Sequence, residues 1–379
     1  MISAGVKLIA CGALVLLLSS CTIVTLPQPQ PYSAEISELL SGRAILGREV
    51  TEAELPNVDV FALTPEMEAF AKGAVRRGDS YFEKVKALHV ALLTSVEAGG
   101  YGIAYSAYVT EPPIITFQQR RANCLSFTLL YVALARSVGL NAKVNEVEIP
   151  PTWDMRNRKD VVFLRHVNVK VPLPGDSINA MQRDDVVIDL EMSRYRANYR
   201  QHEISDTLAS AQFYSNRAME YLDAGNFNDA FLNLRKSINL NNQQSYVWSN
   251  LGALYGRKKL LREAGLAYLH ALELNPDDLT VMNNLSYYYN QIGNKEKALK
   301  FARLAQRYRE SNPFYKYNLA LSAFEQKEYE QALQLVLQAI AREKDDVRFY
   351  ELAATLYEKL DRPAKVQQMQ KEIKKITGE

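Results

Sequence analysis

The feature that most constrains this chain is a period of 34 residues in its C-terminal part. One column of alanines follows this step: Ala230, Ala264, Ala298 and Ala332. A second column holds only small residues: Ala218, Gly252, Ser286, Ala320 and Ala354. Small residues let two antiparallel helices approach closely, and each pair must then stack on a neighbour to bury its open face. The period therefore predicts an all-α solenoid built from copies of one helical pair.

The repeat resembles the tetratricopeptide repeat, and residues 245–278 form its fullest copy. The residues that match the repeat pattern in this copy are Trp248, Leu251, Gly252, Tyr255, Ala264, Tyr268, Ala271 and Pro276. About four copies cover residues 211–344, and residues 347–373 are expected to form a degenerate fifth pair that caps the stack. We predict a repeat domain over residues 206–379.

The resemblance also implies a concave surface, made mostly by the first helix of each pair. The family positions that line it include Asn283, Tyr287, Asn290 and Tyr317 in this chain. Asparagine side chains can hold the backbone of an extended peptide, and tyrosine rings can cover its side chains. We therefore expect a protein partner on the solenoid. The alternatives are ordinary exposed helix residues or a seat for the N-terminal domain.

The N-terminus has the pattern of an export signal. Lys7 precedes an apolar run over residues 8–18, which is shorter than the roughly 20 residues that span a bilayer. The run ends in Leu18-Ser19-Ser20-Cys21, which resembles the bacterial lipoprotein signal. The resemblance implies that residues 1–20 are removed and that Cys21 is acylated, for example with palmitate. The alternative is a simple cleaved signal.

Acylation at Cys21 would attach the protein to a membrane of the bacterial cell envelope, because several acyl chains on one residue give stable anchoring. Thr22 follows Cys21, and in a Gram-negative host this resembles lipoproteins sent to the outer membrane, facing the periplasm. We expect residues 21–62 to be a lipidated tether and linker. The prolines that favour an extended tether are Pro27, Pro29 and Pro31.

Composition excludes several classes of protein. The 379 residues are 47% hydrophobic and 23% charged, which is typical of a globular chain with two or three domains and excludes a multi-span membrane protein. Lys plus Arg number 45 and Asp plus Glu 43, so no global positive charge attracts nucleic acid. The three cysteines, Cys11, Cys21 and Cys124, are too few for a disulfide scaffold. With Cys11 removed and Cys21 acylated, Cys124 is the one thiol left.

Between the tether and the repeats, the pattern changes to helices followed by strands. Helical periodicity covers residues 64–77, 79–97 and 122–138, and the third of these is strongly apolar. Strand-like runs follow at residues 142–149, 161–171 and 185–190. Helices first and antiparallel strands after them indicate an α+β domain, which we place at residues 63–205.

Three residues of this domain have the chemistry of a thiol enzyme. Cys124 lies at the start of the third helix, where free backbone N–H groups and the helix dipole stabilise a thiolate. His166 lies in one strand-like run and Asp189 in the next, and adjacent antiparallel strands can bring them together. A carboxylate beside an imidazole orients it, and the imidazole can take the thiol proton. Read singly, Cys124 could be a small buried hydrophobe, His166 a strand histidine with its hydrogen bonds satisfied, and Asp189 a structural acceptor.

A helix-borne cysteine followed by His and Asp on successive strands resembles the transglutaminase-like domain, which is part of the papain-like group of thiol enzymes. The resemblance covers residues 63–190 and is closest in the cysteine helix, residues 123–140. It implies Cys124 as nucleophile, His166 as general base and then acid, and Asp189 as the residue that orients His166. By analogy Gln118 is a possible second oxyanion donor beside the backbone N–H of Cys124. The alternative for Gln118 is a solvated loop residue.

Two positions of this domain need comment, one that differs from the family pattern and one where two carboxylates could serve. Ala122 stands where the family usually has glycine, so the turn before the nucleophile is expected to be less permissive. Glu191 would share a strand face with Asp189, so either carboxylate could serve. The remaining histidines have no partners at metal-ligand spacing and no phosphate-binding loop is present, so we expect neither a metal nor a cofactor.

Together these patterns predict a membrane-anchored, transglutaminase-like thiol hydrolase, a peptidase or amidase, or an acyl transferase. Its substrate would be a peptide or protein, and the solenoid would recruit the partner. The alternative is a non-catalytic lipoprotein scaffold that binds proteins through its repeats.

Overall fold

The structure is a computed structural model, which describes residues 32–106, 109–147, 153–157, 160–163, 166–173, 185–190 and 199–377. The predicted signal (residues 1–20), the acylation site Cys21 and the proline-rich tether up to residue 31 lie outside the described residues, so they stay predictions. Within the described residues, no helix is both long enough and apolar enough to cross a bilayer.

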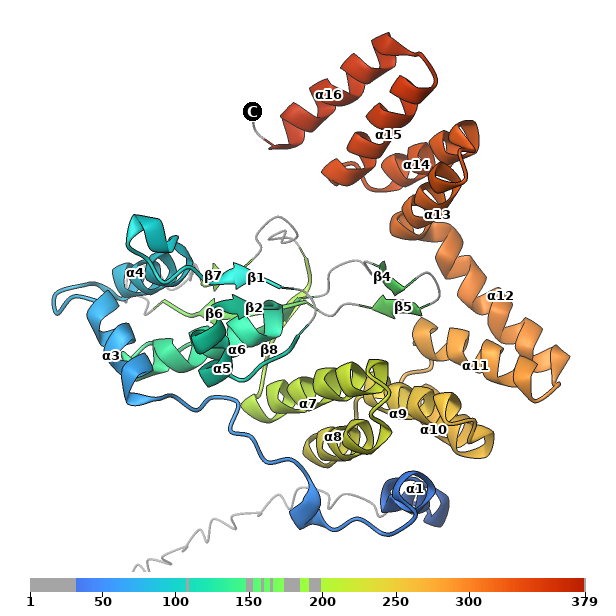
Figure 1. The fold of residues 1–379 in the computed structure, drawn as a ribbon, viewed down its shortest axis with the longest axis horizontal. Coiled ribbons are helices and arrows are strands. Elements are labelled where there is room, and N and C mark those ends of the chain that lie inside the picture. Colours follow the sequence, from blue (N-terminus) through green and yellow to red (C-terminus); the bar gives the residue numbers. More distant parts are fainter. Residues whose placement is uncertain are drawn as a thin grey trace, which may run out of the picture.

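The N-terminal domain combines helices with a small antiparallel sheet (Figure 1). Its helices are α3 (Pro65–Ala74), α4 (Tyr81–Leu93), α5 (Pro113–Gln119) and α6 (Cys124–Ser137), with the short 3-10 turn η2 (Val96–Ala98) after α4. The central sheet has the strand order β7-β6-β3-β8 and is antiparallel throughout: β7 (Val186–Ile188), β6 (His166–Val171), β3 (Lys143–Val147) and β8 (Gln201–Ile204). Two pairs of strands lie outside it: β1 (Ala104–Tyr105) with β2 (Arg121–Ala122), and β4 (Trp153–Asn157) with β5 (Asp160–Phe163).

Helix α6 is the centre of this domain. Every residue from Leu125 to Ala135 is buried, which explains why the helix is apolar on all sides. Its hydroxyl at Thr128 donates to the backbone oxygen of Val167 in β6, so the helix is also tied to the sheet. The helix ends before Gly139, whose φ of +80° suits glycine and few other residues.

The C-terminal region is the predicted solenoid, and the α+β plus all-α fold class is confirmed. Five helical hairpins follow one another over residues 206–377: α7 (Asp206–Asp223) with α8 (Phe227–Leu240), α9 (Ser245–Arg257) with α10 (Leu261–Leu274), α11 (Leu279–Gln291) with α12 (Lys295–Ser311), α13 (Pro313–Glu325) with α14 (Tyr329–Arg342), and α15 (Val347–Lys359) with α16 (Pro363–Thr377). The hairpins follow an arc, and the β4–β5 pair reaches into its inner side, where β4 contacts α13 (Figure 1).

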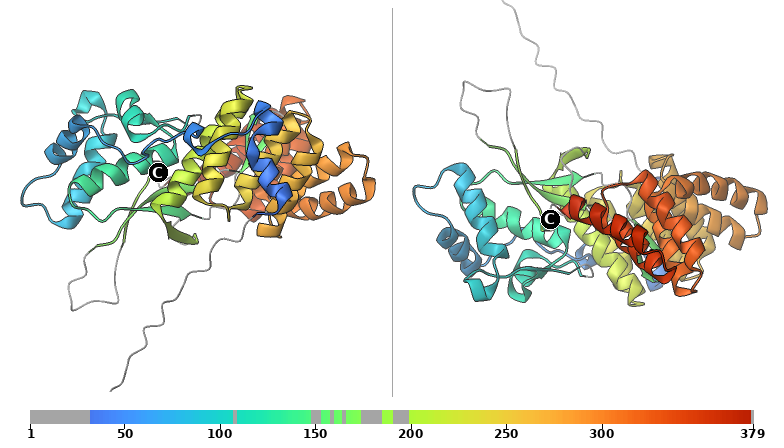
Figure 2. Two further views of the ribbon diagram at one scale, coloured as in Figure 1. Left: turned by 90° about the horizontal axis from the view of Figure 1, so that it is seen from below. Right: turned by 90° about the horizontal axis from the view of Figure 1, so that it is seen from above.

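Residues 32–62 differ from the linker that the sequence predicts. They contain α1 (Ala34–Ser41), α2 (Arg43–Leu46) and the 3-10 turn η1 (Glu52–Glu54). Helix α1 contacts α10, and Figure 2 shows it lying across the solenoid helices. Leu39 and Val50 are buried in the same apolar cluster as the first hairpins of the solenoid. The first part of this segment, up to residue 55, therefore belongs to the repeat core, because its apolar residues complete a face that the first hairpins leave open, while Val60 is buried in the core of the N-terminal domain.

Candidate functional site

The N-terminus of α6 positions Cys124 as the first residue of a helix. Asn123 is the N-cap, and its side-chain Oδ1 accepts from the N–H of Ser126 at 2.8 Å. The backbone oxygen of Asn123 accepts from the N–H of Phe127. In the described part of the chain no hydrogen bond engages the backbone N–H of Cys124. The half-buried thiol of Cys124 therefore lies at the positive end of the helix dipole, beside a free donor.

Sheet register brings His166 and Asp189 to one another. Strands β6 and β7 pair with Val169 opposite Ile188, which places Asn168 across from residue 189. Because side chains alternate along a strand, His166 and Asn168 share the face to which Asp189 belongs. His166 is 8% exposed and Asp189 is 2% exposed, so both groups are removed from water.

His166 lies beside both of its predicted partners. Its Nε2 is hydrogen-bonded to Oδ2 of Asp189, and its side chain is near enough to Cys124 for the thiol to affect the pKa of the imidazole. Since Nε2 faces the carboxylate, Nδ1 is the ring nitrogen that remains for the thiol. Burial lowers the pKa of His166, but the hydrogen bonds and charges of Asp189 and Cys124 outweigh it and raise this pKa to about 10. At neutral pH the imidazole is therefore protonated, and it stabilises a negative charge on the sulfur.

A buried amide network supports Asp189, and sequence reasoning missed it. Asn168 donates from Nδ2 to Oδ2 of Asp189 at 3.3 Å. Asn145 of β3 donates from Nδ2 to Oδ1 of Asn168 at 2.8 Å and to Oε1 of Gln201 at 2.9 Å. Asn168 lies two residues beyond His166 in the same strand, so strand alternation was the signal that could have identified it.

Three other residues were predicted to lie near this site, and the structure describes two of them. Gln118 is exposed near the end of α5, and its oxyanion role stays a prediction. Ala122 is extended in β2 and 1% exposed, while the left-handed residue of this turn is Arg120 with φ of 53°. The alanine therefore imposes no strain at the position where the family has glycine. Glu191 lies outside the described residues, and Asp189 is the carboxylate that His166 contacts.

His89 of α4 is a further titratable group close to this site. The charge of Asp189 acts on it, but burial dominates and lowers the pKa of His89. Its Nδ1 is buried without a hydrogen-bond partner in the described structure. The described residues contain no cluster of His, Cys, Asp and Glu that could hold a metal ion.

The four solenoid residues predicted to bind a partner lie in two environments. Tyr287 is 65% exposed on α11, Asn290 is also exposed, and Asn283 is half-buried. Tyr317 of α13 is half-buried, and its ring lies 5.1 Å from that of Phe349 in the next hairpin. Tyr317 therefore contributes to packing between hairpins, while Tyr287 and Asn290 face solvent.

Comparison with known proteins agrees with this architecture. The transglutaminase-like superfamily matches residues 68–176, and the tetratricopeptide repeat matches residues 245–278 and 279–312. The chain therefore carries a transglutaminase-like domain followed by tetratricopeptide repeats. It is 32% identical over 108 residues to the tetratricopeptide repeat-containing protein trd-1 of Caenorhabditis elegans; the match spans 28% of this chain and 14% of that protein.

Several solved structures resemble part of this chain at low sequence identity. A fragment of MamA from Desulfovibrio magneticus RS-1 is 13% identical, with coverage of 46% of this chain and 96% of that chain and a TM-score of 0.26. YrrB, described as a tetratricopeptide repeat protein with an unusual peptide-binding site, is 15% identical, with 45% and 87% coverage and a TM-score of 0.26. PilF of Pseudomonas aeruginosa is 18% identical, with 45% and 78% coverage and a TM-score of 0.28.

Proposed function

We propose that this protein is a membrane-anchored thiol hydrolase, a peptidase or amidase, that acts on a peptide or protein through Cys124, His166 and Asp189. The observation that carries the proposal is the hydrogen bond between His166 and Asp189, with Cys124 close to His166 at the N-terminus of a buried helix. A lone thiol in an apolar core needs neither a protonated imidazole nor a buried carboxylate beside it. The transglutaminase-like match supports cysteine chemistry of this kind.

In the proposed mechanism the imidazole of His166, whose pKa is raised to about 10, is protonated before substrate binds, and Cys124 reacts as the thiolate. The thiolate of Cys124 attacks the carbonyl carbon of an amide and forms a carbon–sulfur bond. The carbonyl oxygen takes up the negative charge and is stabilised by the backbone N–H of Cys124. The carbon–nitrogen bond then breaks, and His166 gives its proton to the leaving amine.

The second half of the reaction resolves the thioester. Water attacks the thioester carbonyl, its proton returns to His166, and Cys124 leaves as thiolate while the product departs as a carboxylic acid. An amine in place of water would form a new amide through the same intermediate, which is the acyl-transferase variant of the proposal.

Two further parts of the proposal concern location and partner. The segment Leu18-Ser19-Ser20-Cys21 supports lipid anchoring in the bacterial cell envelope, on the periplasmic face of the outer membrane in a Gram-negative host. Tetratricopeptide repeats generally bind proteins or peptides, and the exposed side chains of Tyr287 and Asn290, with Asn283 beside them, support partner recruitment by the solenoid.

The experiment that tests the chemistry is the alkylation rate of Cys124 as a function of pH, in protein that lacks residues 1–20 and carries Cys21→Ser. We expect rapid labelling well below the free-thiol pKa of about 8.5, and a rate at least about tenfold lower in His166→Ala. His202→Ala is the matched control, because His202 lies in β8 with its side chain 54% exposed. An ordinary thiol titration that His166→Ala leaves unchanged would refute the hydrolase and favour a non-catalytic scaffold.

A further inference from the structure

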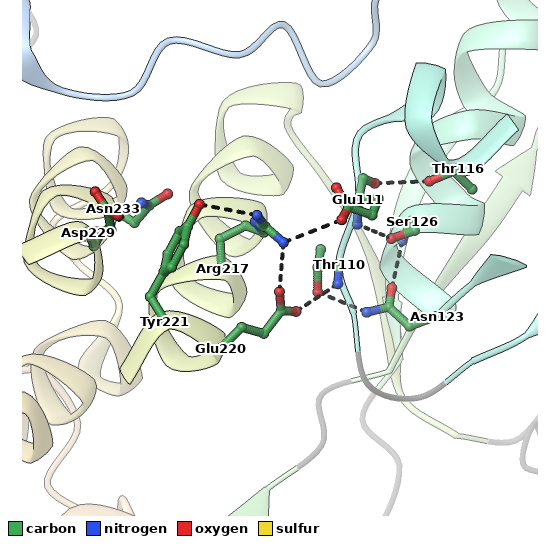
Figure 3. A network of polar contacts seen from close by, with 10 residues as sticks. All are labelled: Thr110, Glu111, Thr116, Asn123, Ser126, Arg217, Glu220, Tyr221, Asp229 and Asn233. Atoms are coloured by element: carbon green, nitrogen blue, oxygen red, sulfur yellow. Dashed lines mark hydrogen bonds and ion pairs between the residues drawn. The ribbon is translucent and has the colours of Figure 1, made fainter. Parts of the chain in front are cut away.

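A polar network joins the first solenoid helix to the start of α6 (Figure 3). Glu220, near the end of α7, accepts from the backbone N–H of Thr110 at 2.7 Å. The Oγ1 of Thr110 accepts from Nδ2 of Asn123 at 2.8 Å. Asn123 in turn caps α6 by accepting from the N–H of Ser126. The network therefore leads from the repeat domain to the residue that precedes Cys124.

The hydrogens in this network have a defined direction. The backbone N–H of Ser126 can only donate, so the atom of Asn123 that faces it is Oδ1, the accepting end of the amide. Nδ2 of Asn123 then points to Thr110, whose Oγ1 has lone pairs that accept its hydrogen. The two ends of an amide are nearly alike in shape, so a directed partner is what selects the capping orientation.

Burial and charge make these contacts strong. Thr110 is 1% exposed, and the side chain of Glu220 is 16% exposed. Arg217 lies in the same helix with Nη1 at 3.0 Å from Oε2 of Glu220 and at 3.6 Å from Oε1 of Glu111. Burial raises the pKa of Glu220, and the hydrogen bond from the backbone of Thr110 and the charge of Arg217 offset only part of this effect. A lost partner in such a setting leaves a buried polar group unsatisfied.

Helices α6 and α7 are also joined at their opposite ends. Arg136, in the last turn of α6, makes two contacts with the carboxylate of Asp206 at the start of α7, at 2.6 and 2.9 Å. Phe213 and Tyr214 of α7 are buried in the core of the N-terminal domain. Helix α7 is therefore a structural part of both domains.

We propose that Glu220 is a positioning residue of the thiol site: through Thr110 it holds the Asn123 cap, and with it the N-terminus of α6, in the orientation that presents Cys124. The repeat domain then completes the thiol site in addition to any role in recruitment. This inference rests on the proposed function for its importance, because the position of a thiol matters only if the thiol reacts.

The test uses the protein that lacks residues 1–20 and carries Cys21→Ser, with Glu220→Ala, Thr110→Val and Thr110→Ser. Hydrogen exchange of the segment 123–126 reports the cap itself, and the alkylation rate of Cys124 reports its effect on the thiol. We expect the hydrogen-exchange rate of this segment to rise at least about fivefold in Glu220→Ala and in Thr110→Val, because a lost N-cap typically destabilises a helix end by about this factor. Alkylation should fall by a similar factor in both variants, and Thr110→Ser should restore both values because it keeps the hydroxyl.

Asp223→Asn is the matched control, since Asp223 is an ion-paired carboxylate of α7 that contacts Arg257 at 2.9 Å and not Thr110. The inference is overturned if the hydrogen-exchange rate of residues 123–126 in Thr110→Val equals the rate in Thr110→Ser. This comparison tests the Thr110 link to the cap even if Glu220→Ala fails to fold. If exchange changes as expected while Cys124 titrates as an ordinary thiol in the unsubstituted protein, the positioning role holds and the hydrolase proposal fails.

Discussion

At the scale of single residues, the thiol site depends on an imidazole held between two groups. His166 is buried, which by itself disfavours its charge, yet Asp189 and Cys124 raise its pKa to about 10. The buried Asn168 donates to the same oxygen of Asp189, Oδ2, that His166 contacts, so two neighbouring side chains hold this oxygen in place. In the proposed reaction, a site of this kind would have its charges arranged before the substrate binds.

The raised pKa of His166 predicts a pH dependence of stability. A group whose pKa is raised in the folded state stabilises it fully below the unfolded value of about 6.5, and this contribution is lost as pH rises through about 10. We therefore expect the free energy of unfolding to exceed that of His166→Gln by on the order of a few kcal/mol at pH 6, and the difference to shrink by pH 10.5.

Denaturant titrations of both proteins between pH 6 and pH 10.5 measure this difference, and titrating groups that do not interact with His166 cancel in the comparison. A difference that stays constant over the range would contradict the raised pKa.

At the scale of elements, each repeat depends on how closely its two helices approach. In the hairpin of α9 and α10, a Cβ built on Gly252 would lie 2.5 Å from Cε1 and 3.0 Å from Cγ of Tyr268. Cγ is at the root of the ring, and Tyr268 is only 8% exposed, so the side chain cannot simply swing away. The close approach that the 34-residue pattern predicts thus depends on the absence of a side chain at Gly252.

This contact predicts opposite effects at two glycines of one helix. Gly252→Ala should lower the free energy of unfolding by about 1–3 kcal/mol, because steric overlap outweighs the better helix propensity of alanine. Gly256→Ala should be neutral or stabilising by up to about 1 kcal/mol, because its Cβ would meet only the hydroxyl of Tyr268 at 3.8 Å. Thermal and denaturant unfolding of the two variants would measure the two changes in unfolding free energy. Equal changes at both positions would refute the packing argument.

At the scale of the whole molecule, the solenoid is joined to both neighbouring parts of the chain. The backbone oxygen of Leu39 in α1 accepts from the hydroxyl of Tyr255, and Glu52 pairs with Arg235 at 2.8 Å. The ring of Tyr32 lies 5.7 Å from that of Trp248. Since residue 32 follows residue 21 by eleven positions, a lipid on Cys21 would keep the second hairpin within about 40 Å of the membrane.

The anchor itself gives the prediction at this scale. In a bacterial host, a labelled fatty acid should mark the unsubstituted protein and fail to mark Cys21→Ser, which should move from the membrane fraction to the soluble fraction. Cys124→Ser is the control, because it keeps the predicted acylation site and should retain label and location. Label that persists in Cys21→Ser would rule out this cysteine as the lipid site.

The sequence by itself determined the features that are written along the chain. The 34-residue period identified the solenoid, the apolar run identified α6, and the order of Cys124, His166 and Asp189 indicated the transglutaminase-like domain. Such signals are readable because helix and strand periodicities, caps and repeats depend on neighbouring residues.

Only the tertiary structure decided which distant groups meet. Thr110 and Glu220 are 110 positions apart, and Leu39 and Tyr255 are 216 apart, so no local pattern predicts either hydrogen bond. Residues 32–62 looked like a linker because their apolar residues follow no long periodicity, yet Leu39 and Val50 fill a gap that the first hairpins leave. Burial of complementary surfaces sets these contacts, and that complementarity exists only once the solenoid and the sheet have both formed.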